Sequence, residues 1–121
     1  MISQSQRGTY LGACQKGTRN ALGDVTGFDY LKRMGYNYVQ LQPVFDHHKT
    51  YDKDGKLLYN WGYDPENYNV PDRQFAADQK NPVAPILELK KMIQAYHEAG
   101  IGVIMDVVYN HTYSSYSSPF Q

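Results

Sequence analysis

The sequence predicts an α/β fold with parallel strands, because one pattern of helix, glycine and strand occurs twice. The second copy, "PILELKKMIQAYHEAGIGVIMDVVY", is the clearer one. Its apolar residues recur at helical spacing on one face: Ile86, Leu89, Ile93 and Tyr96. The run from Val103 to Val108, broken only by Asp106, is otherwise apolar, as in strands covered on both faces. Two such units in succession imply βαβ connectivity, in which the strands run parallel.

The two helix-strand units are expected at residues 24–45 and 85–109. Pro85 suits the first turn of a helix, and Gly100 supplies the left-handed residue that ends it. In the first unit, "GFDYLKRMGYNYVQLQPVF", Gly35 has the same role and the strand begins at Tyr38. The inner face of this first helix is predicted to carry Phe28, Leu31 and Met34.

A long connection, residues 43–82, separates the first strand from the second helix. Structureless connections longer than about 15 residues are uncommon in compact domains and are usually functional or disordered. This one is too rich in Trp, Tyr and Phe to resemble a disordered tail, and its "DKDG" predicts a turn. A right-handed crossover brings both strand ends to one edge of the sheet, where functional loops collect. The sequence therefore predicts a site built from this loop and from Asp106 to His111.

Composition excludes several classes of function. Lysine plus arginine equal aspartate plus glutamate at 12 each, so no basic surplus indicates a nucleic-acid partner. No apolar stretch approaches the roughly 20 residues of a membrane span. The start, "MISQSQRGTY", lacks the apolar region of a signal peptide. The compartment of the parent protein stays open, because this chain is expected to be only a part of it. The single Cys14 excludes an internal disulfide.

The most informative constellation combines aromatic rings with carboxylates. The stretch "YNWGYDPENYNV" contains four rings, Tyr59, Trp61, Tyr63 and Tyr68, among the polar residues Asn60, Asp64, Glu66 and Asn67. Aromatic planes stack on the C–H faces of sugars, while carboxylates and amides bond to the hydroxyls. Spacing alone leaves two interpretations open, a sugar-binding surface and a tyrosine-rich loop that plugs the sheet edge.

A metal site is the other candidate from residue types alone. Asp46, His47 and His48, together with His111, are metal-ligating types. Adjacent histidines on an extended segment point in opposite directions, however, and no HExxH spacing occurs. The phosphate-binding motifs GxGxxG and GxxxxGK[ST] are also absent, so nucleotide binding has no support.

Two motifs resemble the α-amylase family of glycoside hydrolases, and among its members most resemble the type I pullulanases. "YNWGYDP" (59–65) matches the signature of those debranching enzymes, and "DVVYNH" (106–111) matches the family's first conserved region. "GTYLG", "LKRMGYNYVQLQPVFD", "YNVP" and "HEAGIGVIMDVVYNHTY" agree as well, so the resemblance covers almost all of residues 1–121. It implies a fragment of a (β/α)8 TIM barrel, with about two parallel strands, their helices and one long βα loop. It also implies cleavage of α-1,6 branch linkages in pullulan, glycogen, amylopectin or dextrins, with an α-glucan polysaccharide or branched maltodextrin as partner.

The resemblance assigns roles to individual residues. Tyr63 is expected to stack on the glucose just before the scissile bond, and His111 to hydrogen-bond that sugar's primary hydroxyl. Asp106 is expected to orient the arginine that precedes the family's nucleophile. This arginine would be the charged partner that an acid at a strand end requires. Trp61 and Asp64 are expected to shape the site.

The resemblance also predicts what the chain does not supply. No cofactor is expected to be required, although Asn110 matches a position that ligates calcium in many amylases. A full barrel needs about 250 residues, and the family's catalytic carboxyl groups belong to later strands. The chain departs from the family pattern at two places: "DRQFAA" follows "VP", and Pro85 stands where Arg is frequent.

We therefore expect a chain with substrate-binding residues and no catalytic residue, inactive by itself and part of a longer enzyme. Two rival hypotheses remain at this stage. One is a non-catalytic carbohydrate-binding fragment, which would expose unpaired strand edges and apolar faces. The other, less favoured, is a small metal-dependent hydrolase that uses Asp46, His47 and His111.

Overall fold

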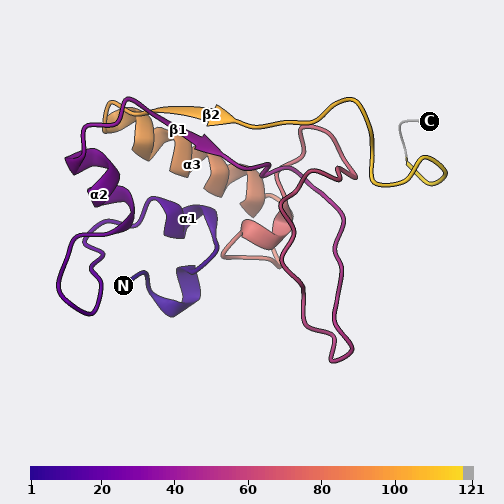
Figure 1. Cartoon of the computed structure of the whole chain (residues 1–121), viewed down its shortest axis with the longest axis horizontal. Helices are drawn as coiled ribbons and strands as arrows, with labels where there is room; N and C mark the ends of the chain where they lie inside the picture. The colour runs from indigo at the N-terminus through magenta and orange to yellow at the C-terminus, as the bar shows by residue number, and fades with distance from the viewer. Residues whose placement is uncertain (119–121) are drawn as a thin grey trace. The chain divides into compact units, whose positions relative to one another are not determined.

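Figure 1 shows the computed structural model of the chain, which describes residues 1–118. Its elements within this range are η1 (Gln4–Gln6), α1 (Tyr10–Ala13), α2 (Gly27–Arg33), β1 (Tyr38–Leu41), η2 (Arg73–Phe75), α3 (Ala84–Glu98) and β2 (Gly102–Met105). None of the helices in this range has the length and apolarity needed to cross a membrane.

The contacts divide the chain into two compact units. The first, here called the helix unit, contains residues 1–40 and 73–104, and therefore every described helix. The second, here called the loop unit, contains residues 41–72 and the chain from residue 105 on. The long connection that the sequence predicts therefore contributes to both units.

β1 and β2 are neighbours in a two-stranded parallel sheet, which confirms the predicted βαβ connectivity. The N–H of Gly102 donates to the carbonyl of Asn37 at 2.8 Å, and the N–H of Asp106 donates to the carbonyl of Leu41 at 3.2 Å. The second strand ends at Met105, so Asp106 directly follows it, and the apolar residues Val107 and Val108 lie beyond the strand. β1 ends two residues before Pro43, which has no N–H to extend the ladder.

The ends of α3 follow the predicted chemistry. Pro85 lies in the first turn, where its missing N–H costs no helical hydrogen bond. Gly100 adopts φ +76°, and the N–H groups of Gly100 and Ile101 donate to the carbonyls of His97 and Tyr96, both at 2.9 Å. This pair of bonds is a Schellman motif, which satisfies carbonyls at the helix end. Gly35, at φ +73°, follows the C-cap of α2, and its N–H donates to the carbonyl of Lys32 at 3.2 Å.

The core of the helix unit forms around α3. Phe28 packs edge-on against Tyr96 with ring centroids 5.0 Å apart, and the Tyr96 hydroxyl donates to the carbonyl of Ala13 at 2.9 Å. The buried apolar residues are Tyr10, Phe28, Ala76, Ala84, Leu89, Met92, Tyr96 and Ile101. Placing Met34 and Ile86 on inner faces was wrong, since 53% and 45% of their surfaces are exposed. Met34 is exposed because it is the C-cap of α2, at the helix end. On α3 the buried face includes Met92, and Ile86 lies outside that face.

Glu88 lies on this buried stripe although it is charged. Its carboxylate accepts the N–H of Ala77 at 2.7 Å and that of Asp78 at 3.2 Å. These bonds tie the last part of the long connection to α3, and they satisfy an acid that is only 6% exposed. Sequence periodicity had given no reason to place a glutamate there.

Candidate functional site

The loop unit brings together three of the residues that the resemblance singles out. The hydroxyl of Tyr63 donates to Oδ2 of Asp106 at 2.6 Å, and Asp106 directly follows β2. His111 lies within 2.7 Å of the carbonyl oxygen of Tyr63 through its Nε2. Tyr63 is therefore held at its hydroxyl by one residue and at its backbone by the other.

The contacts of His111 restrict how its ring can bond. Nε2–H donates to the carbonyl of Tyr63, and Nδ1 lies 2.9 Å from Oδ1 of Asn110. A neutral ring satisfies both contacts when the Asn110 amide is turned so that its NH2 group faces Nδ1. The backbone carbonyl of His111 accepts a bond from the Tyr68 hydroxyl at 2.8 Å. A sugar hydroxyl that binds this imidazole must share or replace one of the two ring contacts.

Further contacts join the segment after β2 to the aromatic loop. The N–H of Tyr113 donates to the carbonyl of Pro65 at 2.9 Å, and the Tyr109 hydroxyl donates to Oδ1 of Asn69 at 2.7 Å. The rings of Tyr113 and His48 stack nearly parallel, with centroids 3.4 Å apart. A cavity of about 250 Å³ lies beside this stack, lined by Pro65, Glu66, Asn67, Thr112, Tyr113, Ser114, Ser117 and Ser118.

The bond between Tyr63 and Asp106 changes how the phenol titrates. A hydrogen bond to a carboxylate stabilises the protonated phenol, and the negative charge opposes formation of a phenolate. The bond to Asp106 therefore raises the pKa of Tyr63 above its ordinary value of 10.0. The ring stays neutral, and its hydroxyl acts as a donor.

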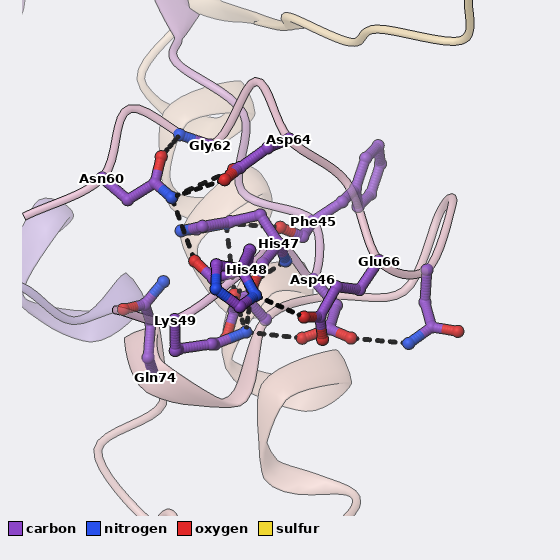
Figure 2. A network of polar contacts seen from close by, with 12 residues as sticks. Phe45, Asp46, His47, His48, Lys49, Asn60, Gly62, Asp64, Glu66 and Gln74 are labelled. Carbon is purple, nitrogen blue, oxygen red and sulfur yellow. Dashed lines mark hydrogen bonds and ion pairs between the residues drawn. The ribbon is translucent and has the colours of Figure 1, made fainter. Parts of the chain in front are cut away.

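The turn of "YNWGYDP" depends on Gly62 and Asn60 (Figure 2). Gly62 adopts φ +88°, and a Cβ at this position would lie 2.8 Å from the carbonyl oxygen of Pro43, so only glycine fits without a backbone shift. The Asn60 amide donates to the carbonyl of His48 and to both carboxylate oxygens of Asp64, each at 3.0 Å, and its oxygen accepts the N–H of Gly62 at 2.9 Å. The Asp64 carboxylate thus helps to fix the turn.

Two rings of the motif face solvent. Trp61 is 61% exposed, and Tyr59 is exposed with its hydroxyl donating to Oε1 of Gln42 at 3.0 Å. Within the loop unit they do not join the Tyr63–Asp106 contact. The "DKDG" turn is present. The N–H of Asp52 donates to the carbonyl of Lys56 at 2.9 Å, and Tyr51 and Leu57 form an isolated antiparallel bridge beside it.

A partly buried ionic cluster at the base of the loop was not predicted from the sequence (Figure 2). The ammonium of Lys49 lies 2.6 Å from Oδ1 of Asp46, 2.7 Å from Oδ2 of Asp72 and 2.7 Å from the carbonyl of His47. Nδ1 of His47 lies 3.2 Å from the same Asp72 oxygen. His47 and Asp72 are buried, with 1% and 0% of their surfaces exposed.

The charges of this cluster stabilise one another. Burial opposes ionisation of Asp46, but hydrogen bonds from Lys49 and Asn67 outweigh it and lower the pKa of Asp46. Burial likewise opposes the charged form of Lys49, and the bonds to Asp46 and Asp72 outweigh it and raise the pKa of Lys49. Asp46 and Lys49 therefore both remain charged around neutral pH.

The predicted metal ligands do not come together. Among residues 1–118, no group of three or more His, Cys, Asp or Glu side chains is arranged to hold a metal ion. Asp46 pairs with Lys49, His47 lies against Asp72, and His48 bonds to Oε1 of Glu66 at 2.9 Å. Asn110, the calcium candidate, is exposed, and its side-chain amide contacts Nδ1 of His111.

Comparison with known proteins identifies the family. The model of the α-amylase catalytic domain matches residues 10–121. The pullulanase of Bacillus subtilis (strain 168) is 36% identical over 115 residues, which cover 95% of this chain and 16% of that protein. An isoamylase of Flavobacterium sp is 38% identical over 112 residues, which cover 92% of this chain and 13% of that protein.

Solved structures agree. The crystal structure of a pullulanase from Anoxybacillus sp. LM18-11 complexed with maltotetraose matches with a TM-score of 0.86 at 44% identity, covering 95% of this chain and 17% of that one. The chain thus spans about one sixth of the length of these pullulanases. On the match of residues 10–121, this chain belongs to the α-amylase family, as part of its catalytic domain.

Proposed function

We propose that this chain is the part of an α-1,6-debranching α-glucan hydrolase that helps to hold the sugar at the scissile bond. One observation carries the proposal: Tyr63 is bonded to both Asp106 and His111, so the residues of two separate family motifs form one group. Its substrate would be a branched α-glucan such as pullulan, glycogen, amylopectin or a branched dextrin.

Tyr63 would provide the platform for the glucose ring. The bond from its hydroxyl to Asp106 and the bond at its carbonyl from His111 fix the ring before any sugar arrives. A ring that is already held loses little conformational freedom when ligand binds, which favours affinity and correct placement. His111 would then bond to the sugar's primary hydroxyl after exchanging one of its present contacts.

Asp106 would orient an arginine from a later part of the catalytic domain. A carboxylate offers about four acceptor sites, so a single carboxylate can bond to a phenol and to a guanidinium at the same time. In this arrangement Asp106 would link the sugar platform to the charged groups of the rest of the catalytic domain. It would act as a positioning residue and not as an acid or base.

The bond-breaking groups would come from elsewhere. A retaining glycosidase needs two carboxyl groups about 5 Å apart on either side of the bond. None of the acidic residues of this chain matches the family's positions for them. We expect no cofactor to be required, with Asn110 as the residue to examine if calcium is found.

A chimera tests the proposal directly. The segment of the Bacillus subtilis pullulanase that aligns with this chain would be replaced by it, and pullulan hydrolysis measured. We expect the chimera to cleave pullulan, the 121-residue chain alone to be inactive, and a His111→Ala chimera to lose most of the activity. A folded chimera that cleaves only α-1,4 linkages would contradict the assignment, as would hydrolysis by the chain alone. Tight binding of maltotetraose by the isolated chain, together with an inactive chimera, would favour a carbohydrate-binding fragment.

A further inference from the structure

We infer that Lys49 is a positioning residue of this site, because it holds together the two ends of the segment 44–72 and thereby sets the position of Tyr63. The inference rests on the proposed function for its kinetic consequence. Its structural consequence is independent of that function. All the contacts that carry it lie within the loop unit.

The two ends of the segment meet as short antiparallel contacts. The N–H of Asp46 donates to the carbonyl of Val70 at 2.8 Å, and the N–H of Asp72 donates to the carbonyl of Val44 at 2.9 Å. Lys49 adds a charged link across this junction, since its ammonium bonds to both Asp46 and Asp72. Everything between the two ends, including the whole "YNWGYDP" turn, is therefore closed into one loop by this junction.

The cluster reaches Tyr63 through His47 and Gly62. His47 lies against Asp72, with Nδ1 3.2 Å from the carboxylate oxygen that Lys49 also contacts. A Cβ on Gly62 would lie 3.4 Å from that same Nδ1, so the imidazole lies close to the backbone that precedes Tyr63. A shift of His47 consequently moves the backbone immediately before the proposed sugar platform.

The cation is needed because one of its partners, Asp72, is shielded from water. Asp72 is fully buried, whereas the side chain of Asp46, at the same junction, is 24% exposed. Without the ammonium, the negative charge of Asp72 is buried beside a second carboxylate, and removing one partner of a buried charge pair is strongly unfavourable. The junction then opens to admit water, or a carboxyl group takes up a proton. Either response displaces His47 from its place under Gly62.

The full 121-residue chain offers separate signals for its two units. Trp61 is the only tryptophan and lies in the loop unit beside Gly62, whereas every described helix lies in the helix unit. Fluorescence anisotropy of Trp61 therefore reports on the loop unit, and circular dichroism at 222 nm reports on the helix unit. We expect Lys49→Met to lower the anisotropy of Trp61 and to leave the helical signal unchanged. The matched control is Lys53→Met, which removes an exposed lysine of the "DKDG" turn and should change neither signal.

Two further variants separate charge from general packing. Lys49→Arg keeps the cation and should restore most of the anisotropy. The double variant Lys49→Met/Asp72→Asn removes the fully buried acid together with the cation and should recover part of the loss, because a buried carboxylate that has lost its cation is worse than a neutral amide in its place.

Kinetics of the chimera test the positioning role. A displaced platform should lower kcat by about tenfold and change KM much less, because small misplacements near the reacting bond act on the transition state. Unchanged anisotropy and kcat in Lys49→Met would overturn the inference. Equal losses of the Trp61 and helical signals would also overturn it, because they would indicate general unfolding. An inactive parent chimera would instead count against the proposed function, and the anisotropy series would still decide the role of Lys49.

Discussion

The hydroxyl of Tyr63 and the carboxylate of Asp106 form a hydrogen bond of 2.6 Å between residues that are 43 positions apart in the sequence. Tyr63 belongs to the turn of a long connection, and Asp106 is the first residue after β2. Their bond places the aromatic ring at the end of the strand, and His111 holds the same tyrosine from its backbone. The two motifs of the family thus act as one arrangement and not as two independent signatures.

Removal of the Tyr63 hydroxyl should separate positioning from stacking. Tyr63→Phe keeps the ring but loses the bond to Asp106, whereas Tyr63→Ala loses both. In the pullulanase chimera we expect Tyr63→Phe to lower kcat severalfold with a small change in KM. Tyr63→Ala should lower kcat and raise KM, each by roughly tenfold or more, because it removes the ring on which the sugar stacks near the reacting bond. Steady-state kinetics on pullulan measure the difference. Equal behaviour of the two variants would show that the ring itself contributes nothing.

The phenol of Tyr63 should titrate above an ordinary tyrosine. The hydrogen bond to Asp106 raises its pKa from 10.0, so this contribution to stability is fully present below pH 10 and is lost as the pH rises through the higher folded-state pKa. NMR of the chain labelled with 13Cζ-tyrosine follows the ionisation, and Tyr63→Phe assigns the signal. In Asp106→Asn the same signal should titrate closer to the ordinary value. An unchanged midpoint in that variant would contradict the contact.

The Lys49 cluster predicts a loss of stability in acid. Hydrogen bonds from Lys49 and Asn67 overcome the effect of burial and lower the pKa of Asp46 below 3.8, so its contribution is present above that pH and is lost as the pH falls through the lower folded value. Urea unfolding followed by Trp61 fluorescence should therefore show a lower midpoint near pH 3 than at pH 7. Asp46→Asn should reduce this pH dependence, and Asp52→Asn, in the exposed turn, provides the control.

Much of the fold was predictable because its signals are local. Helical spacing around Leu89, the stop at Gly100 and the apolar run before Asp106 each depend on neighbouring residues, and the parallel pairing follows from their order. The exposure of Ile86 was not predictable in this way. It depends on which side of α3 contacts the rest of the helix unit, and the buried Glu88 shows that polarity does not decide this.

The residues of the candidate site could be proposed from the sequence, but the contacts between them could not. The resemblance selected Tyr63, Asp106 and His111, but nothing in the sequence indicated that the tyrosine would bond to the other two. The Lys49 cluster was missed because its partner Asp72 is 23 residues away, and the charges in between gave no reason to select that pair. Partners that are three residues apart, such as Asp46 and Lys49, can be proposed from sequence spacing. Asp72 comes close to them only when the segment 44–72 closes into a loop.

Gly62 allows the sharpest test of the loop geometry, because Gly55 offers a matched comparison. Both glycines have positive φ, +88° and +75°, so an alanine at either position is strained by its backbone conformation, by about 1 kcal/mol. A Cβ on Gly55 would meet nothing within 4 Å, whereas one on Gly62 would lie 2.8 Å from the backbone oxygen of Pro43. Backbone cannot rotate away as a flexible side chain can, so the turn that carries Tyr63 must move.

Gly62→Ala should therefore destabilise the loop unit by roughly 2–3 kcal/mol and Gly55→Ala by about 1 kcal/mol, as measured by urea unfolding at the Trp61 signal. In the chimera, Gly62→Ala should also lower kcat on pullulan, because it displaces Tyr63 from Asp106, whereas Gly55→Ala should not. Equal stability losses for the two variants would mean that backbone conformation alone requires glycine at position 62, and that the close approach to Pro43 does not constrain the turn.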